Sequence, residues 1–223
     1  MVDVDAQIEA VERAVQTLDV DGSPSRVQTL TQTYASPIDD VWDAVTNAER
    51  IGRWFLPLSG DLRIGGTYQL EGNASGSVQA CEPPSETGGP ALYRVTWEYG
   101  GGVTWLTVRL EAIDPGHTKL ELEHVARVAD VPDELWRQFG PAGTGIGWDQ
   151  GLLGLGLHLA APDARPDNIE VWNMGDEGRR FMRRSADAWA AAQADDGIDP
   201  EVAAAAAEAT FRMYTGEAPG PMG

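Results

Sequence analysis

The 223-residue sequence contains little cysteine, little positive charge and few long apolar runs. Cys81 is its single cysteine, which excludes an internal disulfide and is typical of a protein from a reducing compartment. Sixteen Lys and Arg residues stand against 35 Asp and Glu, giving a net charge of −19. Because phosphate contacts need Lys and Arg, this charge argues against nucleic acid and anionic membrane surfaces as partners.

Targeting and membrane-spanning segments are not evident in the sequence either. The N-terminus has no basic region followed by an apolar run, so no signal peptide is predicted. The longest apolar stretch, residues 151–161, is too short to span a bilayer. We therefore expect a cytoplasmic protein without membrane insertion.

Strong catalytic and metal-binding motifs are missing as well. Residues 140–145 are rich in glycine, but Ile146-Gly147 follow where a phosphate-binding loop needs Lys and Ser or Thr. There is no Gly-x-Ser-x-Gly elbow. The three histidines are widely spaced and have no Cys or His neighbour at metal-ligand spacing. We predict no catalytic residue, no metal site and no cofactor.

The most informative stretch that is present, residues 33–72, runs from a strand through two short helices into another strand. Pro37 suits the first position of the first helix, whose apolar residues recur at helical spacing. The second helix is expected at residues 48–55. Gly65-Gly66 then forms a turn into an alternating strand at residues 67–70.

This order of elements resembles the SRPBCC superfamily, also called START-like or helix-grip proteins. Within it, the chain resembles the branch named for the activator of the heat-shock-protein-90 ATPase. The resemblance covers roughly residues 26–160 and implies an α+β helix-grip fold, in which a curved antiparallel sheet wraps around a long C-terminal helix. Ten residues of the stretch 33–72 carry the resemblance: Pro37, Val41, Trp42, Ala44, Thr46, Trp54, Phe55, Gly65, Gly66 and Gly72.

Periodicity extends this picture to the rest of the domain. Helical spacing predicts an N-terminal helix at residues 5–18, within an N-terminal segment 1–25, from Ile8, Val11, Val15 and Leu18. Alternating patterns separated by turn residues predict an antiparallel meander, with strands at 26–34, 75–82, 91–99, 103–113 and 117–128.

A helix at residues 141–160 is expected to cover one face of this sheet. It has glycines at positions 143, 147, 151, 154 and 156, and each interior glycine costs about 1 kcal/mol relative to alanine. Such glycines either let the helix approach its neighbours closely or leave free volume beneath it. The sequence leaves both alternatives open.

Residues 161–223 form a predicted C-terminal extension. A polar linker at 161–168 precedes two helices, at about 176–194 and from Asp199-Pro200 to Gly216, which we expect to pack back onto the domain as a hairpin. Burial of Phe181 and Trp189 would indicate that the hairpin closes a cavity. Four arginines near the start of the hairpin are expected to form a solvated face balanced by Asp and Glu: Arg179, Arg180, Arg183 and Arg184.

Candidate binding residues follow from the chemistry of a mostly apolar cavity. Such a cavity needs a few placed polar groups, and an aromatic ring with one polar edge suits an amphipathic ligand. Core packing is the alternative for each candidate. We nominate six residues: Trp54, Tyr68, Trp97, Trp105, His124 and Trp148.

The resemblance implies a protein that binds a hydrophobic or aromatic small molecule between the sheet and the long helix. One alternative is a co-chaperone-like interaction module, with a chaperone contact or a homodimer. Another is an enzyme of the cyclase or dehydratase kind, for which Glu71, Glu98 and His124 are the nominees. An acidic residue without a partner inside the sheet would favour the enzyme, whereas an all-apolar cavity would favour binding.

Overall fold

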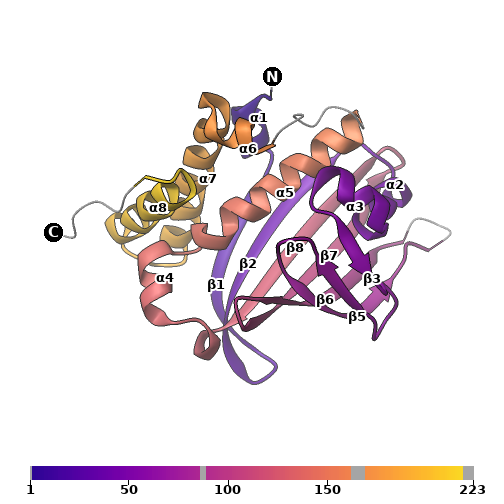
Figure 1. The fold of residues 1–223 in the computed structure, drawn as a ribbon, viewed down its shortest axis with the longest axis horizontal. Helices are drawn as coiled ribbons and strands as arrows, with labels where there is room; N and C mark the ends of the chain where they lie inside the picture. The colour runs from indigo at the N-terminus through magenta and orange to yellow at the C-terminus, as the bar shows by residue number, and fades with distance from the viewer. Residues whose placement is uncertain (1, 86–88, 162–168, 218–223) are drawn as a thin grey trace.

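In the computed structural model of the chain, which describes residues 2–85, 89–161 and 169–217, an eight-stranded antiparallel sheet curves around one long helix (Figure 1). The α+β helix-grip fold is therefore confirmed. The strand order across the sheet is β1-β2-β8-β7-β6-β5-β4-β3. The strands are β1 Glu12–Val20, β2 Ser23–Tyr34, β3 Leu58–Gly60, β4 Thr67–Leu70, β5 Ser75–Glu82, β6 Ala91–Tyr99, β7 Gly102–Asp114 and β8 His117–Arg127.

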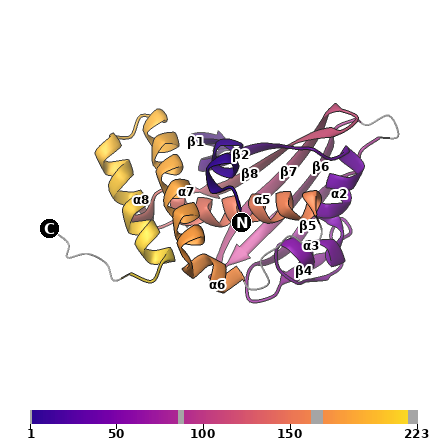
Figure 2. The ribbon, with the colours of Figure 1, turned by 90° about the horizontal axis from the view of Figure 1, so that it is seen from above.

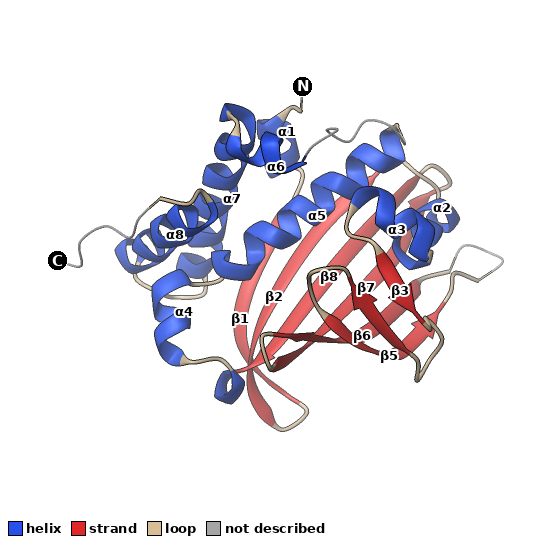
Figure 3. Cartoon of the chain, viewed as in Figure 1, coloured by secondary structure: helices blue, strands red, loops and turns tan. Residues whose placement is uncertain are grey.

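The helices lie on the concave side and at the ends of this sheet (Figure 3). The long helix α5 crosses the concave face, with α2 and α3 near one of its ends and the α7-α8 hairpin near the other (Figure 2). The helices are α1 Val4–Glu9, α2 Ile38–Thr46, α3 Ala48–Trp54, α4 Asp133–Phe139, α5 Ala142–Ala160, α6 Ile169–Met174, α7 Asp176–Asp195 and α8 Pro200–Tyr214, with a 3-10 turn at Val128–Asp130.

Most elements predicted from periodicity are confirmed. The strands at 75–82 and 91–99 have the predicted bounds, and the long helix begins one residue later than predicted, at Ala142. The hairpin helices are present, and the Asp199 carboxylate accepts from the backbone N–H groups of Glu201 and Val202, as a helix cap does. The short elements β3, α4 and α6 were not predicted.

The predicted helix at residues 5–18 is wrong beyond Glu9, because β1 follows and pairs with β2 along its whole length. The turn between them is Asp21-Gly22, with φ of 51° and 77°. Positive φ at both positions matches the two-residue turn that suits a twisted hairpin. The Asp-Gly pair was thus the sequence signal for a hairpin, and pairing with β2 outweighs the helical spacing of the apolar residues.

The C-terminal hairpin packs back onto the domain, and its Phe181 and Trp189 are fully buried. Trp189 lies against Gly145 of α5, where a Cβ atom would come within 2.3 Å of the indole ring. The hairpin therefore covers α5 from the side of α1 and β1, and none of its described residues lines the cavity described below, so that the closure of a cavity by the hairpin stays a prediction. The arginine face is ion-paired as predicted, to Asp5, Glu9, Asp187, Glu208 and Glu217.

Two predictions stay open. The polar linker falls largely on residues 162–168, outside the described part of the chain. The division into segments 1–25, 26–160 and 161–223 stays a prediction, although β1 from the first segment belongs to the same sheet as the strands of the second.

Candidate ligand cavity

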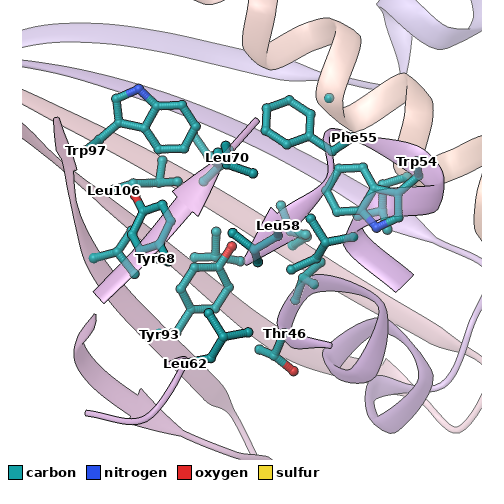
Figure 4. Close-up of a pocket in the computed structure, with 18 of the residues that line it drawn as sticks. Thr46, Trp54, Phe55, Leu58, Leu62, Tyr68, Leu70, Tyr93, Trp97 and Leu106 are labelled. Carbon is teal, nitrogen blue, oxygen red and sulfur yellow. The ribbon is translucent and has the colours of Figure 1, made fainter. Parts of the chain in front are cut away.

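A cavity of about 140 Å³ lies between the concave face of the sheet and the helices α3 and α5 (Figure 4). Inward-facing residues of the central strands form its floor, because side chains alternate between the two faces of a strand. These are aliphatic: Val78, Val95, Leu106, Val108, Leu120 and Leu122. The cavity is therefore a largely apolar space inside the grip of the sheet.

Glycines of α5 explain both why this space is open and how the helix is held. At Gly151 an added Cβ would meet only the Phe55 ring, at 3.8 Å, and Gly151 lines the cavity. At Gly154, by contrast, a Cβ would lie 2.5 Å from the carbonyl oxygen of Trp54. Both alternatives left open by the sequence thus apply, each at different positions of one helix.

Aromatic rings form the wall beside α3 and α5. The ring centroids of Trp54 and Phe55 are 5.7 Å apart, those of Phe55 and Trp97 6.5 Å, and those of Trp97 and Trp148 4.9 Å. The indole N–H of Trp54 donates to the carbonyl oxygen of Ala44 at 2.9 Å, which fixes that ring. The wall presents flat apolar faces to whatever occupies the cavity.

Four of the six nominated residues line the cavity: Trp54, Tyr68, Trp97 and Trp148. Trp105 does not, because it lies on the other face of β7, where the Arg127 guanidinium sits 4.6 Å from its ring centre. Its neighbours Leu106 and Val108 mark the inward positions of β7. Alternation along that strand would have excluded Trp105.

His124 lies behind the cavity wall and is not among its lining residues. Its Nδ1 accepts from the indole N–H of Trp148 at 3.3 Å, and its Nε2 is 2.8 Å from the Thr104 hydroxyl. An indole nitrogen can only donate, so Nδ1 is unprotonated and Nε2 carries the hydrogen. Burial lowers the pKa of His124 to about 4, which keeps the ring neutral. His124 therefore positions Trp148.

The lining residues that were not nominated from the sequence include two aromatic residues and the cysteine: Phe55, Tyr93 and Cys81. Tyr93 shares the inward face of β6 with Val95 and Trp97, so alternation alone would have added it. Cys81 faces inward because the register of β5 against β6 shifts between Val78 and Ala80. Such a bulge reverses the alternation beyond it, and a sequence pattern does not reveal it.

No Asp, Glu, His, Lys or Arg is among the described residues that line the cavity. The nominated Glu71 and Glu98 are both exposed at the surface. Within the described ranges, no group of three or more His, Cys, Asp and Glu side chains is arranged to hold a metal ion. No helix of the described chain is long and apolar enough to cross a membrane.

Comparison with known proteins adds the following findings. The sequence profile of the family described as "Activator of Hsp90 ATPase homolog 1-like protein" matches residues 35–156. The crystal structure of CalU16 from Micromonospora echinospora is 32% identical, with a TM-score of 0.62 over 82% of this chain and 98% of CalU16. Its solution structure gives 30% identity and a TM-score of 0.64 over 84% and 97%.

A more distant structure shares the fold alone. Protein MLL2253 from Mesorhizobium loti is 20% identical, with a TM-score of 0.50 over 62% of this chain and 99% of that protein. No protein with a curated description matches the chain.

Proposed function

Because the chain belongs to the activator of Hsp90 ATPase homolog 1-like family of the SRPBCC superfamily, we propose that its helix-grip cavity binds a hydrophobic or aromatic small molecule. The observation that carries the proposal is the cavity of about 140 Å³, walled by aromatic rings. An engineered apolar cavity of about 150 Å³ in another protein holds benzene, so the space suits a ligand built on one aromatic ring. The proposed contacts are Trp54, Phe55, Tyr68, Trp97 and Trp148.

Binding fits this site better than catalysis. An enzyme of the cyclase or dehydratase kind would need an acid or base with a shifted pKa inside the cavity. Glu71 and Glu98 lie outside, and both ring nitrogens of His124 are engaged behind the wall. The chaperone contact and the homodimer stay predictions. A cytoplasmic location is part of the proposal and is supported by the single free thiol of Cys81.

The first experiment is native mass spectrometry of the protein purified from its own host, followed by denaturation and identification of any released molecule. We expect an apolar or aromatic compound at near one-to-one stoichiometry. The proposal would be contradicted if every preparation lacked a bound small molecule and the protein also failed to bind added one-ring aromatic compounds.

A matched pair of variants at Gly151 ties binding to this cavity. Gly151→Leu places a branched side chain into the space, whereas Gly151→Ala adds one methyl group and leaves most of the space free. We expect both variants to fold, and only Gly151→Leu to lose the co-purifying molecule. Equal occupancy in the two variants would show that the ligand binds elsewhere.

A further inference from the structure

The hydroxyl group of Tyr93 differs from the other hydroxyl groups of the cavity wall. The Tyr68 hydroxyl donates to the carbonyl oxygen of Thr96 at 2.7 Å, and the Thr46 hydroxyl donates to that of Trp42 at 2.6 Å. Among the residues that the structure describes, none forms a hydrogen bond with the Tyr93 hydroxyl. Buried tyrosine hydroxyls usually have a partner, whereas this one is not among the fully buried unpaired polar atoms and is accessible to a molecule in the cavity.

The position of Tyr93 directs this free group at the ligand space. Its ring packs edge-on against Trp42, with centroids 6.3 Å apart and an interplanar angle of 63°. In Figure 4 its hydroxyl oxygen points into the interior of the group of lining side chains, whereas the indole nitrogen of Trp97 points away from it. Burial raises the pKa of Tyr93, so its oxygen keeps the hydrogen and remains a donor.

Cys81 lies directly across the strand pair from Tyr93. The bulge between Val78 and Ala80 turns this thiol toward the cavity, which it helps to line. Burial raises the pKa of the Cys81 thiol, which therefore stays protonated and uncharged. Both side chains are neutral and line an otherwise apolar space from the neighbouring strands β5 and β6.

We infer that the Tyr93 hydroxyl is the polar anchor of the cavity, with the Cys81 thiol on the neighbouring strand, and that the ligand is an uncharged aromatic compound bearing a carbonyl oxygen that accepts from Tyr93. This inference rests on the proposed binding function and specifies its ligand class. A carboxylate ligand does not fit, because no cation lines the described cavity and a buried unpaired charge is costly. A plain hydrocarbon fits less well, because it leaves the hydroxyl without a partner.

The test compares acetophenone with α-methylstyrene, which have nearly the same shape but differ in a carbonyl oxygen against a methylene group. Affinity is measured by isothermal titration for the unmodified protein, for Tyr93→Phe and for the control Tyr99→Phe. Tyr99 lies on the same strand but is 64% exposed and does not line the cavity, so removal of its hydroxyl should leave ligand preference unchanged. Acetophenone labelled with ¹³C at the carbonyl reports the hydrogen bond directly, as a downfield shift on binding.

We expect the unmodified protein and Tyr99→Phe to favour acetophenone by roughly five- to tenfold, the value of one hydrogen bond. Tyr93→Phe should bind both compounds with the affinity of the hydrocarbon and lose the downfield shift. Equal affinities for both compounds in the unmodified protein would overturn the polar anchor while leaving the binding function standing. No saturable binding of either compound would overturn both.

Discussion

The two faces of the helix α5 differ in how closely they are packed. The face at positions 148, 151, 152 and 155 borders the cavity. The opposite face, at positions 145, 146, 149 and 153, packs against α7 and its neighbours, and among its residues Ile146 and Leu153 belong to the same apolar cluster as Phe181. One face leaves space beneath it, and the other is closely filled. A helix with both faces buried also explains why α5 is apolar all round.

The hydrogen bonding of polar groups also differs between the two faces. On the filled face, the buried Asp149 carboxylate accepts from Arg13 at 2.8 Å, from the Ser185 hydroxyl at 2.5 Å and from the Trp189 indole at 3.0 Å. On the cavity face, the Tyr93 hydroxyl opposite α5 has no partner in the described chain. A cavity costs stability, because its lining loses contacts. The filled face holds α5 in place, so the cavity can stay open.

The largest effect should come from breaking the filled face at Asp149. Asp149→Ala would leave the Arg13 guanidinium buried without its counter-ion, since the two side chains are only 1% and 5% exposed. Removing one partner of a buried ion pair typically costs about 3–5 kcal/mol. We expect a loss of that order in the free energy of unfolding, measured by urea denaturation.

A surface ion pair provides the control for Asp149. Arg63 pairs with Asp61 at 2.7 Å, but its side chain is 87% exposed. Solvent screens such pairs, so Arg63→Ala should leave the urea midpoint unchanged. A small loss for Asp149→Ala, comparable to that of Arg63→Ala, would mean that the hairpin is not held through this carboxylate.

The contacts of the filled face were the least predictable from the sequence. Arg13 falls within the helix predicted at residues 5–18, and its burial becomes visible only once β1 pairs with β2 and faces Asp149, 136 residues away. Contacts of this kind depend on tertiary placement that a local pattern does not contain. Asp149 was predicted only as part of the helix at residues 141–160, which indicates the fold and not the ion pair.

The residues that line the cavity were easier to predict, because the alternation of side chains along a strand is a local property of the sequence. Tyr68, Trp97 and Trp148 line the cavity, and strict alternation would have added Tyr93 and removed Trp105. Two features were beyond that reasoning. The bulge that turns Cys81 inward leaves no sequence pattern, and His124 is separated from the space by the very ring that it holds.

Lowering the pH should destabilise the folded protein, because His124 behind the cavity wall becomes protonated. Its pKa is lowered from 6.5 to about 4 by burial, so the unfolded chain binds a proton more readily than the folded one. The stabilisation is therefore fully present above pH 6.5 and is lost as the pH falls toward 4. Between pH 7 and pH 4.5 this amounts to about 2 kcal/mol. The added proton would sit on Nδ1 against the Trp148 N–H, which should loosen that wall.

Urea unfolding at several pH values checks this prediction, with His124→Asn as the variant that does not titrate. His158 needs a control of its own, because burial and nearby Arg50 also lower its pKa. We expect His124→Asn to flatten the pH dependence between 7 and 4.5 more than His158→Asn does. The lowered pKa values of Asp40, Asp43 and Glu208 act below this window. An unchanged slope in His124→Asn would place the proton uptake elsewhere.

Effects of opposite sign should come from adding one methyl group to each face of α5. In Gly145→Ala the new Cβ would lie 2.3 Å from the Trp189 ring, and overpacking of this kind costs about 1–3 kcal/mol. In Gly151→Ala the Cβ enters open space 3.8 Å from Phe55, so the better helix propensity of alanine should add up to about 1 kcal/mol. Thermal unfolding of both variants measures the difference. Stabilisation by both substitutions would mean that the hairpin packs no more closely than the cavity wall, and the two faces of α5 would then not differ as described.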